Sequence, residues 1–169
     1  MAALLVAIIA GVVIVVLQLL PFQYQRAHRR WAQQQIHHYE LEVAWADGWS
    51  FGHARVEMRD DQFVRGVDLD TGQPLAPNKL LYAGYFGSVD KLFAIIEKRV
   101  RLAWNWRNLL ARYVPAVARR LDSCVAPLGE VNYDSDYGYP SNIWYNDSWC
   151  TNTFFNYSNV KITQFTPLP

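Results

Sequence analysis

The residues most suggestive of chemistry lie in the stretch VNYDSDYGYPSNIWY, residues 131–145, where two acids flank a serine. Asp134 and Asp136 have the spacing of the first two acids of a calcium loop. Such a loop also needs an oxygen ligand at position 5, glycine at position 6 and glutamate at position 12. Counted from Asp134, those positions hold Gly138, Tyr139 and Tyr145. The pattern fails at all three, so we do not predict a calcium site.

The same stretch has the residues of a well-specified turn. The side chain of Asp134 or Ser135 can accept hydrogen bonds from nearby backbone N–H groups, and Gly138 can adopt a positive φ. Pro140 favours re-entry into an extended strand. We therefore interpret Asp134, Gly138 and Pro140 as structural turn residues whose acids and tyrosines are simply exposed.

The histidines do not form a recognisable metal or catalytic motif. His37 and His38 are adjacent, so they point in different directions on a helix or a strand, and His28 and His53 are scattered. No nucleophile elbow, glycine-rich phosphate loop or haem attachment motif is present. We predict no enzymatic activity, no cofactor and no metal. A metal site assembled by folding is the alternative.

Two cysteines, Cys124 and Cys150, are 26 positions apart, unlike the close pair of a redox or zinc site. They flank a segment that we interpret as a hairpin. A structural disulfide is the favoured interpretation, and two free buried thiols are the second.

The composition favours a globular domain with an extra segment. The chain has 169 residues, of which 51% are hydrophobic and 15% aromatic, enough for a substantial core. The formal net charge is only +1, so no overall field attracts nucleic acid, and we predict no nucleic-acid partner.

The N-terminal segment predicts a membrane anchor. Residues 2–20, AALLVAIIAGVVIVVLQLL, carry no charge and are nearly long enough to cross a hydrocarbon layer of about 30 Å. A cleaved signal peptide is the alternative, but no Lys or Arg precedes the apolar run. We predict a single transmembrane helix at residues 1–22 in a bacterial cytoplasmic membrane. Arg26, Arg29 and Arg30 just beyond it favour a cytoplasmic C-terminal domain under the positive-inside rule.

The remaining chain predicts an α+β domain. Residues 23–38 read as a stalk or short helix, and residues 39–169 as the domain. Strands are expected at 39–45, 53–59, 62–70, 129–134, 141–147 and 159–165, and a long loop at 71–87. One helix is expected at 88–113, with Ser88 at its N-cap and Asp90 in its first turn. The predicted fold is an antiparallel sheet of five to six strands with this one long helix packed on it.

The expected helix and its continuation are strongly basic. Residues 88–120 contain eight Lys or Arg side chains against two acids, Asp90 and Glu97. A solvated basic face is one interpretation. The other is a docking surface for anionic lipid or an acidic partner. Trp104, on the margin of the Ile96–Val100 side, widens the apolar face beyond what one sheet would cover.

The order of several motifs resembles a bacterial family of secreted or lipid-anchored small domains of unknown function. The motifs are I.HYELEV at 36–43, ARVEMRDDQFVRGVDLDTGQPL at 54–75, SVDKLFAIIEK at 88–98 and VNYDSDYGYPSNI at 131–143, whose core is a YDxxYGYPxxI segment. The resemblance covers roughly residues 31–145. It implies an extracytoplasmic domain tethered at the membrane, against the arginine signal, and brings no catalytic role. The sequence departs from the family in lacking both a cysteine pair after the first strand and a lipoprotein cysteine.

These features together predict a non-catalytic accessory or scaffolding subunit of a larger integral membrane complex, such as a photosynthetic, respiratory or monooxygenase assembly. The partners are then that complex and the lipid bilayer, and the domain docks on or caps the extracytoplasmic side. A stripe of small residues in the predicted span permits close helix contact. The predicted docking residues are Ala3, Ala7, Gly11, Trp45, Trp49, Arg101, Trp104 and Arg107.

The alternative function is a free membrane-tethered domain that binds a small ligand or an envelope polymer. Its binding surface would be aromatic and formed by Tyr137, Tyr139, Trp144 and Tyr145.

Overall fold

The structure is a computed structural model that describes residues 21–46, 50–103, 128–146 and 157–169. A helix covers residues 21–34 of the described part. The labelled elements that follow are β1 (His38–Ala46), β2 (Phe51–Arg59), β3 (Gln62–Asp68), α2 (Pro77–Phe86), α3 (Val89–Ala103), β4 (Leu128–Tyr133), β5 (Pro140–Asn146) and β6 (Tyr157–Pro167).

The six described strands form one antiparallel sheet in the order β3-β2-β1-β6-β5-β4. Two three-stranded meanders, β1–β3 and β4–β6, are joined by the pairing of β1 with β6, in which Trp45 lies opposite Val160. This sheet confirms the strand part of the predicted fold class.

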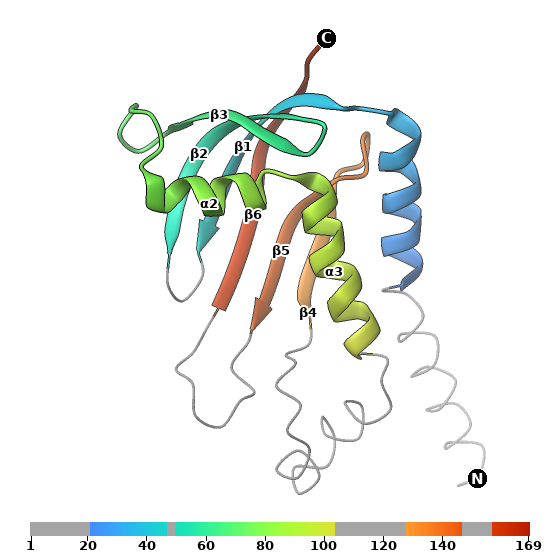
Figure 1. Ribbon diagram of the computed structural model, residues 1–169. Coiled ribbons are helices and arrows are strands. Elements are labelled where there is room, and N and C mark those ends of the chain that lie inside the picture. Colours follow the sequence, from blue (N-terminus) through green and yellow to red (C-terminus); the bar gives the residue numbers. More distant parts are fainter. Residues whose placement is uncertain (1–20, 47–49, 104–127, 147–156) are drawn as a thin grey trace, which may run out of the picture.

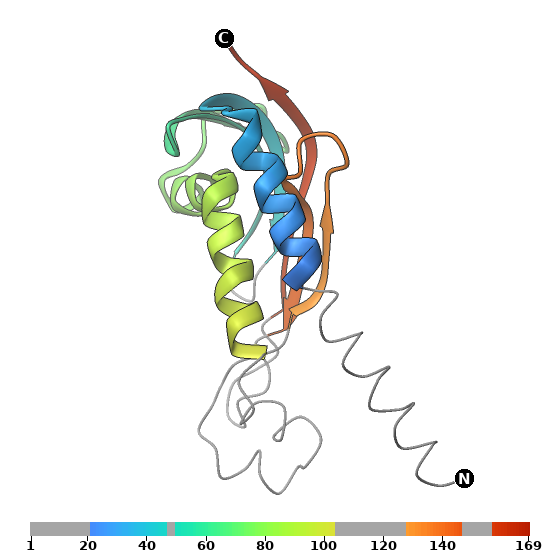
Figure 2. The ribbon, with the colours of Figure 1, turned by 90° about the vertical axis from the view of Figure 1, so that its right-hand side faces the viewer.

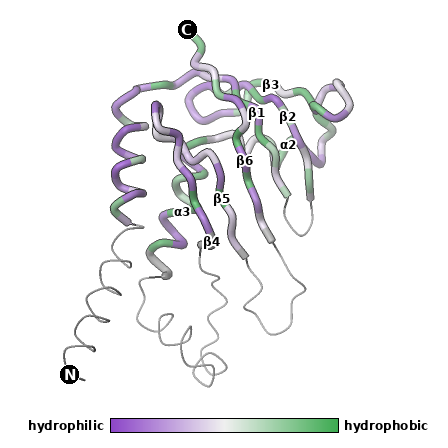
Figure 3. The backbone as a smooth tube through the Cα atoms, turned by 180° about the vertical axis from the view of Figure 1, so that it is seen from behind, coloured by the Kyte–Doolittle hydropathy of each residue, from purple (hydrophilic) through white to green (hydrophobic). Residues whose placement is uncertain are grey.

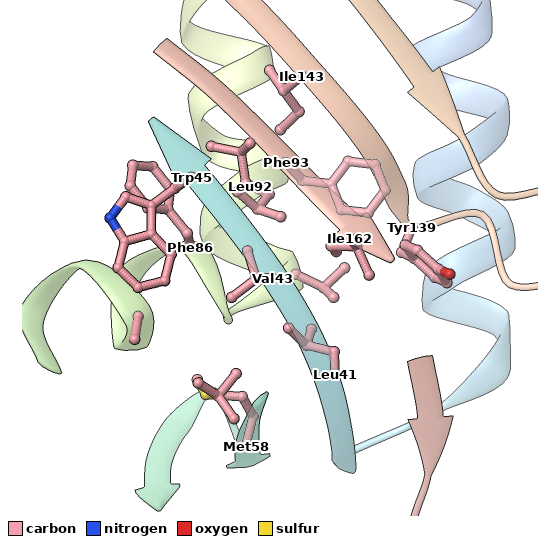
Figure 4. Close-up of a cluster of buried hydrophobic side chains, with 14 of the residues drawn as sticks. Leu41, Val43, Trp45, Met58, Phe86, Leu92, Phe93, Tyr139, Ile143 and Ile162 are labelled. Atoms are coloured by element: carbon pink, nitrogen blue, oxygen red, sulfur yellow. The ribbon is translucent and has the colours of Figure 1, made fainter. Parts of the chain in front are cut away.

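The alternating sequence of the strands explains why the helices lie on one face only. In β1, Tyr39, Leu41 and Val43 are buried, whereas Glu40 and Glu42 between them point to the other side. Figures 1 and 2 show the helix at residues 21–34, α2 and α3 all on the same side of the sheet. Figure 4 shows the resulting core, in which strand side chains meet Phe86 of α2 and Leu92 and Phe93 of α3.

The predicted transmembrane anchor is wrong, and so is the single-pass membrane localisation derived from it. Among the described residues, no helix is long and apolar enough to cross a membrane. Residues 21–34 are largely hydrophilic in Figure 3, and the indole of Trp31 packs against the rings of Tyr39 and Phe165. Residues 1–20, with Ala3, Ala7 and Gly11, lie outside the described part. The helix at residues 21–34 consists mostly of polar residues, as expected for a helix on the surface of a domain. Only a narrow stripe of it, including Ala27, is buried, and its other side chains meet solvent.

The helix α2 lies where the sequence predicted a loop at 71–87. Pro77 is at the start of the helix, where the missing N–H of proline has no cost, and the backbone of Gly87 closes its end through a hydrogen bond to Ala83. Ala83 and Phe86 are its buried residues, so only one short stripe faces the core. That stripe is too short to give a clear helical period in the sequence. The described part of the other predicted helix, α3, agrees with expectation.

Candidate functional site

The turn at residues 134–140 fastens the N-terminal helix to the sheet. The Asp134 carboxylate accepts hydrogen bonds from the backbone N–H groups of Asp136 and Tyr137, at 2.9 and 2.8 Å. Gly138 has φ of +85°. The turn presents carbonyl oxygens to the helix, where Arg30 donates to Ser135 and Gln34 donates to Asp136. This loop thus has an architectural role in the described structure, and Pro140 is the first residue of β5.

The most exposed apolar side chains that share one helix lie on α2. Leu81 is 76% exposed, Tyr85 is 44% exposed and Leu80 is 38% exposed. Leu81 and Tyr85 are four residues apart, so they lie above one another on the same helical face. We call Leu80, Leu81 and Tyr85 the α2 patch.

Two contacts hold α2 rigidly on the edge of the sheet. The side-chain ammonium of Lys79 donates to the buried carboxylate of Asp68 at 2.7 Å, and the backbone N–H groups of Asp70 and Thr71 donate to its other oxygen. Gly84 faces the ring of Phe63, since a Cβ placed on Gly84 would be 3.4 Å from Phe63 Cβ. These contacts anchor α2 on β3 and so set the side of the helix on which the α2 patch lies.

The Lys79–Asp68 contact gives a testable pH dependence. The hydrogen bond from Lys79 lowers the pKa of Asp68 below its ordinary value. A carboxyl group whose pKa is lowered by folding stabilises the folded state above its ordinary pKa, and this stabilisation is lost as the pH falls through the lowered value. We expect Lys79→Met to be less stable than the wild type at pH 7, and to lose less stability between pH 4 and pH 2.

Urea unfolding at a series of pH values measures this difference. Lys98→Met is the matched control, because Lys98 is exposed on α3 and its loss should leave the acid limb of the profile unchanged. Equal acid limbs for the wild type and Lys79→Met would contradict the proposed role of this contact.

A polar cluster lies on the sheet face opposite the helices. The buried carboxylate of Glu57 contacts His38 Nε2 at 2.8 Å and accepts a hydrogen bond from Arg65 Nε at 2.6 Å. The hydrogen bonds from His38 and Arg65 lower the pKa of Glu57. Nearby, Arg55 donates to Glu42 at 2.7 Å. Within each of these cross-strand pairs, the acidic side chain is compensated by its basic partner. Among the described residues, no three acidic, histidine or cysteine side chains are placed to hold a metal ion.

Of the predicted docking residues, the structure describes the side chain of Trp45 alone. Trp45 is 3% exposed and packs against Phe86, so its indole belongs to the core. Arg101 lies in α3, where the structure describes its backbone but not its side chain. Trp49, Trp104 and Arg107 lie outside the described residues, as do Cys124 and Cys150.

The four aromatic residues of the alternative function do not form one surface. Tyr139 and Tyr145 are each 7% exposed and belong to the core, and Tyr137 packs on it. Trp144 is 39% exposed and precedes Tyr145 in β5, so its side chain points to the opposite face of the sheet. The ring of Tyr145 instead lies under the guanidinium of Arg99, at 3.7 Å.

The architecture defines an α+β domain built on an antiparallel sheet with helices on one face. Residues 23–106 match the family model described as "Family of unknown function (DUF6174)". The matched residues span most of the N-terminal helix, the meander β1–β3, α2 and the described part of α3. They end before the YDSDYGYPSNI segment, so that motif is not part of the match. No curated protein and no solved structure matches the chain.

Sequence reasoning missed the α2 patch because it assigned 71–87 to a loop. The available signal was Pro77 followed by a run of helix-compatible residues and closed by Gly87. Within that run, Ala83 and Phe86 form an i, i+3 pair that is buried in the core. Leu81 and Tyr85 lie on another side of the helix.

Proposed function

We propose that this protein is a non-catalytic accessory domain that binds a partner protein through the α2 patch. The observation that carries the proposal is the exposure of Leu81, Leu80 and Tyr85 on one short helix that is anchored to β3. Folded domains bury large apolar side chains where they can, and a group of them on one exposed face is typical of a protein interface.

The partner surface that fits this patch is an apolar groove. Leu81 and Tyr85 have the i, i+4 spacing with which a helix inserts two anchors into such a groove, and Tyr85 keeps its hydroxyl available at the rim. The membrane location predicted for the partner depended on the span at residues 1–22, whereas the α2 patch itself requires only a protein with an apolar groove.

We expect Leu81→Asp to weaken the affinity for the partner about tenfold or more, because a carboxylate cannot enter an apolar groove without losing its hydration. The partner is first identified by placing a photo-crosslinking amino acid at position 81 of the full chain. Its affinity for the wild type and for variants is then measured by calorimetry.

Ala94→Asp is the matched control, since it adds the same carboxylate at an exposed position of α3. It should bind like the wild type. A partner that binds Leu81→Asp and the wild type equally, with both variants folded, would exclude the α2 patch as the interface.

A further inference from the structure

The helices α2 and α3 meet at a corner formed by two residues, Gly87 and Ser88. Figure 1 shows that α2 lies across the strands, whereas α3 runs along them. The angle at this corner therefore decides in which direction the side chains of the α2 patch project from the domain. Two residues outside regular structure do not fix such an angle by themselves, so contacts with the neighbouring elements have to fix it.

A single buried hydroxyl from β1 contacts both sides of the corner. The hydroxyl of Tyr39 donates to the carbonyl of Gly87, directly after α2, at 3.3 Å. The same hydroxyl accepts the backbone N–H of Val89, the first residue of α3, at 3.1 Å. Tyr39 is 2% exposed and Val89 is 0% exposed, so water does not reach either bond. Burial raises the pKa of Tyr39 above its ordinary value, which keeps the hydroxyl protonated and able to donate.

The corner also contacts β2 and the turn between β2 and β3. A Cβ placed on Gly87 would be 2.7 Å from Cγ2 of Val56, so the backbone of the corner lies directly on β2. The hydroxyl of Ser88 donates to Asp61 Oδ1 in the turn, at 2.8 Å, and accepts the backbone N–H of Lys91 at 3.2 Å. This serine therefore caps the first turn of α3 and joins it to the turn. The hydrogen bond from the tyrosine hydroxyl acts instead on the end of α2.

The two helices differ in how many other contacts hold them. Four apolar side chains of α3 are buried, namely those of Val89, Leu92, Phe93 and Ile96. In α2 the buried residues are Ala83 and Phe86. Packing of apolar side chains supplies most of the free energy that holds a helix in place. We therefore expect α3 to keep its position when the hydroxyl is removed, and α2 to move.

We propose that Tyr39 is the positioning residue of the α2 patch, because its hydroxyl sets the angle at which α2 meets α3. This inference rests on the proposed function, since it concerns how the same three side chains are presented to the same partner. Without the hydroxyl, the carbonyl of Gly87 and the N–H of Val89 lose their buried hydrogen-bond partner and turn toward water. The end of α2 then moves away from β1, and the patch adopts several orientations, of which one fits the groove.

The test is Tyr39→Phe in the full chain. Phenylalanine keeps the ring contacts of position 39 with Trp31 and Phe165 and lacks only the hydroxyl. Residual dipolar couplings of the backbone N–H groups report the orientation of each helix relative to the sheet. In the wild type, the couplings of α2, α3 and the described strands should fit one alignment tensor. In Tyr39→Phe, the couplings of α2 should fall below that fit, while those of α3 and the strands stay unchanged.

Tyr133→Phe is the matched control. It removes the hydroxyl of another tyrosine that packs on the core, on β4, at the far end of the sheet from β2 and β3. Because α2 lies on β2 and β3, all couplings of this control, including those of α2, should match the wild type.

The functional measurement is the affinity for the protein that is crosslinked at position 81. A patch that is correctly oriented in about one fifth of the molecules binds about fivefold more weakly, so Tyr39→Phe should weaken the affinity by about that factor. The double variant Tyr39→Phe/Leu81→Asp should bind no more weakly than Leu81→Asp alone, because orientation has no effect once the main anchor is lost. A purely structural role of Tyr39 would make the two effects add.

Two results would overturn this role of Tyr39. One is a set of α2 couplings in Tyr39→Phe that fits the wild-type tensor, and the other is an unchanged affinity of Tyr39→Phe when Leu81→Asp binds weakly. Equal binding by Leu81→Asp and the wild type would instead contradict the proposed function, and the couplings of α2 would still show whether the hydroxyl orients the helix.

If Tyr39→Phe does not fold, the wild type provides the test. A hydroxyl proton held between Gly87 and Val89 exchanges slowly with water and gives its own NMR signal. Exchange of the Tyr39 hydroxyl proton that is too fast for such a signal would overturn the proposal without any variant.

Discussion

Gly138→Ala is expected to destabilise the protein by about 2 to 4 kcal/mol and to loosen the N-terminal helix. Two costs add. The residue has φ of +85°, a conformation that an L side chain rarely adopts. In addition, a Cβ at this position would be 2.6 Å from the carbonyl oxygen of Ala27 and 2.9 Å from Cβ of Arg30, so the backbone of the helix must move.

Gly72→Ala separates these two costs. Gly72 also has a positive φ, of +70°, but a Cβ there meets nothing within 4 Å. Gly72→Ala should therefore lower the free energy of unfolding only by the conformational cost, about 1 kcal/mol. Chemical denaturation measures both variants, and hydrogen exchange of the amides of residues 21–34 reports on the helix. Equal losses for the two alanine variants would mean that the turn does not hold the helix.

Phe93→Ala is expected to have the largest effect on stability, about 3 to 5 kcal/mol. Phe93 is 2% exposed, and its ring lies 4.9 Å from the ring of His28, 5.9 Å from that of Tyr24 and 6.3 Å from that of Tyr133. It therefore joins α3 to both the N-terminal helix and β4. Truncation removes these contacts and leaves a cavity that three separate elements would have to fill together.

Leu81→Ala is the matched control for Phe93→Ala. It also shortens an apolar side chain in a helix, but that side chain is 76% exposed, so the loss in unfolding free energy should stay below about 0.5 kcal/mol. The control also extends the functional proposal, because the same variant should weaken partner binding without affecting stability. A loss below about 1.5 kcal/mol for Phe93→Ala would show that the core relaxes around position 93.

The strands and α3 were predictable because their local patterns agree with their burial. Tyr39, Leu41, Val43 and Trp45 alternate with two glutamates and Ala44, and the observed strand β1 buries those four. The span predicted at residues 2–20 rested on hydropathy and length alone. Those residues lie outside the described part, and within it no helix is long and apolar enough to cross a membrane.

The candidate sites were less accessible to sequence reasoning. Asp61 and Ser88 are far apart in the chain, and only the packing of the β2–β3 turn on the start of α3 brings them within hydrogen-bond distance. Likewise, the exposure of Leu81 depends on which side of α2 contacts the sheet, and a loop prediction carries no such information.

The strand order has a consequence for how the chain folds. The pairing of β1 with β6 joins residues more than 110 positions apart, such as Ala46 and Asn159, and among the described strands it is the link between the two meanders. Such distant contacts form only after the long intervening loop has closed, which costs entropy and slows folding. During synthesis β6 is the last of the six strands to leave the ribosome. Until then one side of β1 is an unpaired edge, the state in which this chain is most exposed to pairing with another copy.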